Sequence, residues 1–139
     1  MSATSLAAFA CYGVVAVASM VVGAVYLFRP TFMPHHQDAA GKPWEELEPR
    51  LQVLILGLMR AAGGGFLGAG IAAAFLLAIP FRDGDAWSHF AIPGIGLATA
   101  LPMLYATVLI RSRTGARTPV LPGAICVVLI LAGVALSMI

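Results

Sequence analysis

Residues Ser5–Phe28 read SLAAFACYGVVAVASMVVGAVYLF and contain no charged side chain. A helix needs about 20 mostly apolar residues to cross the hydrocarbon core of a bilayer. Three further apolar segments follow at about 49–79, 87–110 and 120–138, and only Arg60 places a charge deep inside one of them. We therefore predict an all-α membrane protein whose residues 1–139 form a single transmembrane domain. Its core is a bundle of four transmembrane helices, the first at about 5–28.

The composition excludes an ordinary soluble domain. Hydrophobic residues make up 60% of the chain and charged residues 10%, whereas soluble domains average about 45–50% and about 25%. A water-soluble fold of this size needs more polar side chains to cover its surface. The chain also has only two cysteines, which excludes a disulfide-rich scaffold.

The basic residues are distributed unevenly between the connections. Six of the eight Lys and Arg residues belong to the first and third connections, namely Arg29, Lys42, Arg50, Arg111, Arg113 and Arg117. Basic residues favour the cytoplasmic side of a membrane. We therefore expect loops 29–48 and 111–119 in the cytoplasm and both termini on the non-cytoplasmic side. The first segment lacks the basic start of a secretory signal, so we expect it to be retained as a helix.

Small residues recur at three- and four-residue spacing in the second segment. Gly57, Ala61, Gly64 and Gly68 share one helical face, and we call these four residues the glycine stripe. Small residues let membrane helices approach closely, so the stripe is a predicted helix-packing interface. It packs either inside the bundle or against another chain. The three consecutive glycines at 63–65 would also permit a bend at a binding site.

Arg60 is the main candidate for ligand binding. A charged residue inside a membrane segment is costly unless it has a partner, and the four segments contain no acidic residue. Its possible partners are backbone carbonyls, hydroxyls or an external anion. Tyr105 and Tyr26 lie at similar predicted depth, so these three residues form a hypothetical site for the phosphate or carboxylate of an anionic amphiphile. In the alternative interpretation, Arg60 extends to the lipid headgroups.

The first connection combines histidines with a tryptophan. His35, His36 and Asp38 are possible metal ligands, but adjacent histidines point apart on most backbones. We therefore predict no metal and no cofactor. Trp44 follows Pro43 and precedes acidic residues, a pattern typical of a short helix at the membrane interface.

No catalytic motif is present. The chain lacks G-x-S-x-G, H-E-x-x-H, a phosphate-binding loop and a carboxylate pair inside the segments. The preferred hypothesis is a non-catalytic homo-oligomer or an accessory subunit of a membrane assembly. Its partners would be membrane lipids and membrane subunits, not nucleic acid. The alternatives are binding or transport of an anionic lipid or amphiphile, and an intramembrane enzyme for a lipid or isoprenoid that uses Arg60, Tyr105 or His89.

Four segments carry a resemblance to a known family. They read YLFRPTFMP, PRLQVLILGLMRAAGGG, IPFRDGDAW and LYATVLIRSRTGARTP. Together they resemble an uncharacterised family of small four-helix bacterial inner-membrane proteins. The resemblance runs from about Tyr26 to the end of the sequence. It implies the four-helix architecture and a bacterial inner membrane, and it implies no reaction.

Overall fold

The computed structural model describes residues 1–139 and is entirely helical. Four helices are long and apolar enough to cross a membrane, with α3 continued to Phe81 by a π-helical turn, η2. This confirms the prediction of four long apolar helices. The elements are α1 (Ala3–Phe28), α2 (Pro34–Ala40), η1 (Trp44–Glu46), α3 (Pro49–Leu76), η2 (Leu77–Phe81), α4 (Ser88–Thr114) and α5 (Val120–Ser137).

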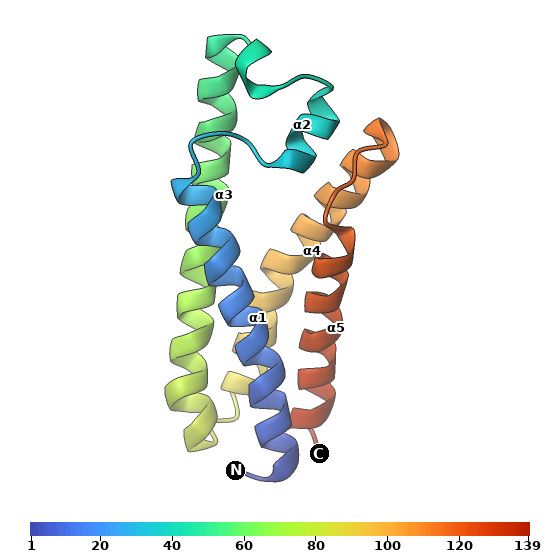
Figure 1. The fold of residues 1–139 in the computed structure, drawn as a ribbon. Helices are drawn as coiled ribbons and strands as arrows, with labels where there is room; N and C mark the ends of the chain where they lie inside the picture. The colour runs from blue at the N-terminus through green and yellow to red at the C-terminus, as the bar shows by residue number, and fades with distance from the viewer.

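The four long helices run alternately up and down (Figure 1). Both termini lie at one end of the bundle, and α2 and η1 lie at the other, which we call the α2 end (Figure 1). The connection between α4 and α5 is also at the α2 end, so six of the eight basic residues lie at this end. Arg29, Lys42 and Arg117 are in the connections, whereas Arg50 is at the start of α3 and Arg111 and Arg113 are in the last turn of α4.

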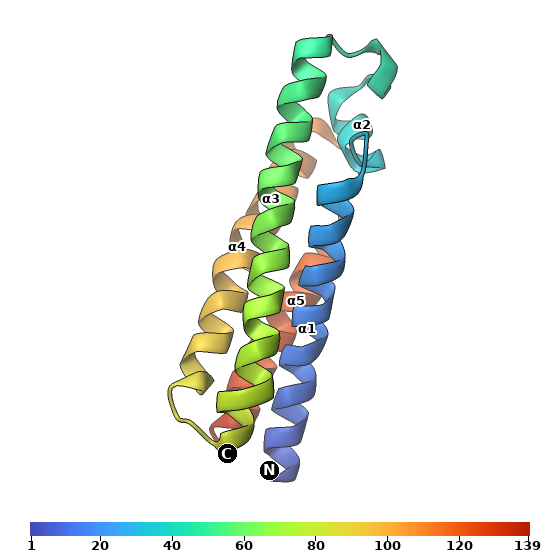
Figure 2. The same cartoon turned by 90° about the vertical axis from the view of Figure 1, so that its left-hand side faces the viewer.

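The helix ends follow local sequence signals. Ser2 caps α1 by accepting a hydrogen bond from the backbone N–H of Ser5 at 3.1 Å. Gly41 and Gly115 end α2 and α4 in the left-handed conformation, with φ of 66° and 75°. The α3 helix begins at Pro49 and extends past the end of α1 at the α2 end (Figure 2). This extension accounts for the excess length of the second apolar segment.

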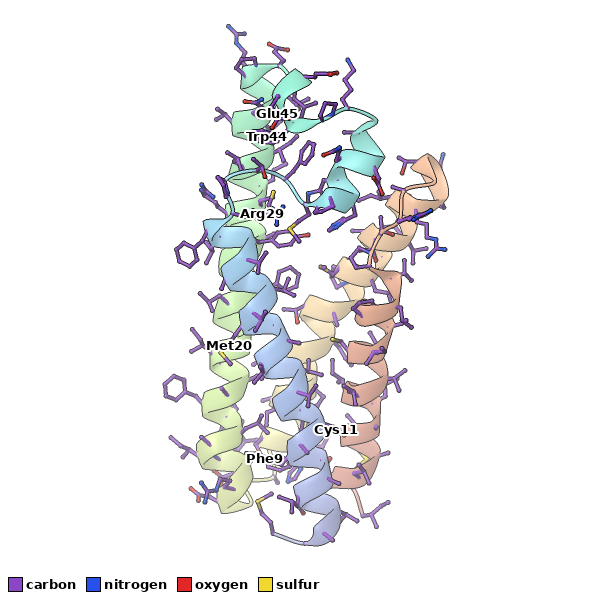
Figure 3. The ribbon with its side chains drawn as sticks, viewed as in Figure 1. Phe9, Cys11, Met20, Arg29, Trp44 and Glu45 are labelled. Atoms are coloured by element: carbon purple, nitrogen blue, oxygen red, sulfur yellow. The ribbon has the colours of Figure 1, made fainter.

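Glycines bring α1 and α3 into direct backbone contact. Gly23 of α1 faces Gly63 of α3, and a Cβ atom on Gly63 would lie 2.8 Å from the carbonyl oxygen of Gly23. Nearer the termini, a Cβ on Gly70 would lie 2.6 Å from Cγ of Met20, a side chain that lies over α3 (Figure 3). The helices can therefore approach this closely only because these positions lack side chains.

The glycine stripe predicted from the sequence is on a different face of α3. Gly57, Ala61, Gly64 and Gly68 are all exposed, and a Cβ on any of the three glycines would meet no atom within 4 Å. The expectation that the stripe packs inside the bundle is therefore wrong. Glycines occupy several faces of α3, and α1 selects the face where its own Gly23 permits the closest approach.

The two ends of the bundle are well packed. At the terminal end, the ring of Tyr12 fills the space left by Gly133 of α5, where a Cβ would lie 2.6 Å from the ring. The core cluster there contains Ala8, Tyr12, Leu77, Phe81, Ile92 and Ile130. At the α2 end, Phe32, Leu47 and Met59 form a second buried cluster. Between these clusters α1 leans away from α5 (Figure 1).

Candidate functional site

A half-open pocket of about 340 Å³, which we call the cavity, lies between the two packed ends of the bundle. All four long helices contribute to its wall, together with the segment that carries α2. Nine of its 15 lining residues are hydrophobic, and none is Asp, Glu, Lys or Arg. The lining includes Val22 and Tyr26 from α1, Ala100 and Met103 from α4, and Pro122 and Cys126 from α5.

The cavity results from the different partners of α1 and α5. The glycine contact at Gly23 and Gly63 keeps α1 on α3 toward the α2 end. At the terminal end, α5 crosses α1 where Gly133 meets Tyr12. Beyond this crossing α5 follows α4 instead (Figure 1). The space between α1 and α5 therefore widens toward the α2 end.

The short helix α2 covers the wide end of this space. Met33, its N-cap residue, and His35 both line the cavity. The helix is only seven residues long, between Pro34 and the left-handed Gly41. Short helices are marginally stable alone, so side-chain contacts must hold α2 in place.

His36 provides such contacts. Its Nδ1 accepts the backbone N–H of Met33 at 3.3 Å, and its Nε2 lies 3.5 Å from the hydroxyl oxygen of Tyr26. Burial and the neighbouring His35 lower the pKa of His36 to about 4. Burial also lowers the pKa of His35, with Asp38 acting in the opposite direction. Both imidazoles are therefore neutral at pH 7.

The two histidines are closer than expected from the sequence. Their ring centroids are 4.3 Å apart, with the ring planes at 71°. The expectation that adjacent histidines point apart is wrong here, because both rings pack against aromatic or apolar neighbours at the α2 end. His36 also contacts Phe32, which in turn contacts Trp44 at a centroid distance of 5.1 Å. Trp44 lies above the end of α1 (Figure 3) and opens the predicted short helix, η1.

Two hydroxyl groups lie at the narrow end of the cavity. Ser19 donates to the carbonyl oxygen of Phe66 at 2.8 Å, and Thr99 donates to that of Gly96 at 2.9 Å. Both donors therefore have backbone partners. Below them is a second cavity of about 20 Å³, which shares Ser19, Thr99 and Val15 with the first. It has room for about one water molecule.

The residues of the predicted anion site do not meet in the structure. Arg60 is exposed and donates from Nη1 to the carbonyl oxygen of Leu27 at 2.9 Å, so it caps the C-terminal end of α1. Tyr105 is 69% exposed on α4, whereas Tyr26 lines the cavity. His89 lies at the terminal end, where its ring contacts Phe81.

Most of the cavity could not be predicted from the sequence. Most of its lining residues are ordinary apolar side chains, and none belongs to a recognisable motif. One signal was available: Tyr12, Ser19 and Tyr26 recur at seven-residue spacing, which places their hydroxyl-bearing side chains on one face of α1. All three line one of the two cavities.

Comparisons with known proteins give no relative. No family model matches the chain, and no curated protein or solved structure is significantly similar to it. The resemblance to small four-helix bacterial inner-membrane proteins therefore stays a prediction. On its own structure, the chain is an all-helical protein with four helices suited to cross a membrane.

Proposed function

We propose that this chain is a multi-pass membrane protein that binds a neutral lipophilic molecule in the cavity between α1, α4 and α5. The supporting observation is the cavity itself. Small-molecule sites are mostly apolar pockets of about 300–1,000 Å³. At about 340 Å³, this cavity falls within that range.

A neutral ligand fits the lining better than the anionic amphiphile expected from the sequence. A buried charge is costly unless an opposite charge or strong hydrogen bonds compensate for it. The lining offers no Lys or Arg side chain, and its His35 is neutral at pH 7 because burial lowers its pKa. Arg60 is engaged with the carbonyl of Leu27 outside the cavity. We therefore place the ligand in the cavity, away from Arg60, and expect it to carry no carboxylate or phosphate group.

The proposal can be tested by filling the cavity. Ala100 lines it, whereas Ala106 is exposed on the same helix. The purified protein would be titrated with methyl dodecyl ketone or tetradecanoate, and bound molecules would be counted by native mass spectrometry. We expect the wild type and Ala106→Phe to bind one ketone, and Ala100→Phe to bind none. Binding that Ala100→Phe leaves unchanged, or a preference for tetradecanoate, would contradict the proposal.

The exposed glycine stripe favours a second function, association with another membrane helix. Gly57, Ala61, Gly64 and Gly68 have no partner within the chain, although they offer the close backbone approach that drives helix pairing in lipid. A second copy of the chain, or a subunit of a larger assembly, would cover them.

The mass of the purified protein in detergent tests this second function, because it gives the oligomeric state. We expect the protein to form oligomers in mild detergent, and Gly64→Leu with Gly68→Leu to convert them to monomers. Gly65→Leu, which is exposed beside the stripe, is the matched control. A wild-type protein that is monomeric and purifies without any other subunit would contradict this function.

We also propose that the protein resides in the bacterial inner membrane with the α2 end in the cytoplasm. The support is that six of the eight Lys and Arg residues lie at that end, because Lys and Arg favour the cytoplasmic side of a membrane.

A further inference from the structure

The hydrogen bonds of His36 determine the role of the Tyr26 hydroxyl. Nδ1 of His36 accepts the N–H of Met33 at 3.3 Å, so it carries no proton. In a neutral imidazole the proton must then be on Nε2. Nε2 faces the Tyr26 oxygen at 3.5 Å and therefore donates to it.

This arrangement leaves the Tyr26 proton free. The tyrosine oxygen accepts from His36, so its own O–H is available to donate elsewhere. Tyr26 and His35 both line the cavity, and His35 is next to His36 in α2. Through its contact with His36 the Tyr26 hydroxyl is held beside α2, next to the wide end of the cavity. Leaving a hydroxyl donor unpaired in apolar surroundings is costly, so a hydrogen-bond acceptor on a ligand that takes the place of water there stabilises the complex.

The other hydroxyl donors of the cavity have partners. Ser19 and Thr99 both donate to backbone carbonyls at the narrow end. Cys126, which also lines the cavity, is only a weak donor. The polar atoms available to a ligand are thus concentrated at the α2 end of the cavity, where Tyr26 and His35 line its wall. The remainder of the lining suits a hydrocarbon chain.

We propose that Tyr26 donates its hydroxyl proton to the carbonyl oxygen of the molecule in the cavity, so that the ligand is a neutral long-chain ketone, ester or quinone. His36 is a positioning residue in this account, because it acts through Tyr26. The ligand lies with its carbonyl under α2 and its chain directed toward Ser19 and Thr99. This inference rests on the proposed function and adds the chemical class of the ligand.

The test compares two probes of matched chain length, methyl dodecyl ketone and tetradecane. Only the ketone accepts a hydrogen bond, so we expect the wild type to bind it about tenfold more tightly. Tyr26→Phe keeps the ring that packs between α1 and α2 but loses the donor. We expect this variant to bind both probes equally, with tetradecane affinity unchanged.

A second variant examines the role of His36. His36→Phe keeps an aromatic ring beside Phe32 but removes the bonds to Met33 and Tyr26. We expect it to lose part of the preference for the ketone and to retain tetradecane affinity. If His36 had only a structural role, the variant would bind both probes more weakly by the same factor.

The outcomes separate the two proposals. Equal binding of ketone and alkane by the wild type would overturn the inference on Tyr26 and leave the proposed function standing. A preference for the ketone that survives in Tyr26→Phe would overturn it as well. Failure of both probes to bind would overturn the proposed function and the inference with it.

Discussion

The contact between α1 and α3 predicts that one methyl group at Gly63 separates the two helices. In Gly63→Ala, the new Cβ would lie 2.8 Å from both the carbonyl oxygen of Gly23 and the backbone nitrogen of Leu27. Ordinary contacts begin at 3.4 Å. Because both neighbours are backbone atoms, no side-chain rotation relieves the clash. The helices must move apart by about 0.6 Å or distort locally.

The expected loss can be estimated against a matched control. Overpacking a well-packed contact costs about 1–3 kcal/mol, while replacing a helical glycine with alanine gains about 0.5–1 kcal/mol. Gly65→Ala makes the same replacement two residues away, where a Cβ meets nothing within 4 Å. The helix-propensity gain is shared, so the difference between the two variants isolates the clash. We expect Gly63→Ala to be less stable than Gly65→Ala by about 1–3 kcal/mol.

The assay is reversible unfolding in mixed micelles with increasing dodecyl sulfate, followed by circular dichroism. Gly65→Ala should unfold at or above the wild-type midpoint, and Gly63→Ala below it. Equal free energies of unfolding for the two variants would refute the packing of α1 on α3 through Gly63. So would a Gly65→Ala variant that loses more stability than Gly63→Ala.

Three further predictions concern the α2 end. The folded-state pKa of His36 is lowered from 6.5 to about 4, so docking of α2 should be complete above pH 6.5. It should then weaken by up to about 1.4 kcal/mol per pH unit as the pH falls toward 4. Tyr26 and His35 are the titratable side chains that contact His36, and Asp38 acts on His35. Trp44 fluorescence in a single-tryptophan variant measures this docking, and a signal constant from pH 7 to 4 would contradict it. Arg60→Met should lower the free energy of unfolding by about 0.5–1.5 kcal/mol in the same micelle assay, because the carbonyl of Leu27 loses its donor; no loss would show that the bond does not stabilise α1. Arg113→Cys in a cysteine-free background should react with a membrane-impermeant maleimide only after the cells are lysed, because the α2 end is in the cytoplasm. Labelling of intact cells would show the opposite orientation.

The long helices could be predicted because a membrane demands long apolar segments without charge. Their bounds differ from the sequence prediction by a few residues, most at the end of α4, which continues past 110 to Thr114. The basic Arg111 and Arg113 made that last turn resemble a loop. Basic residues are favourable at a helix C-terminus, so the helix extends through them.

The contact face of α3 could not be predicted from α3 alone. Glycine is present on several of its faces, and a single helix pattern does not show where its partner has a small residue. The decisive residue is Gly23, in a different helix. The same limit applies to the cavity, which depends on how α1 and α5 diverge. It also applies to Tyr26 and His36, which meet only because α2 folds back over α1.

The most direct test of the proposed ligand site is an experimental structure of the protein in lipid nanodiscs with a brominated methyl dodecyl ketone. We predict density for one ketone between α1 and α5, with its oxygen beside the Tyr26 hydroxyl and its chain extending toward Ser19 and Thr99. A structure in which α1 closes against α5 and leaves no space below α2 would contradict the account.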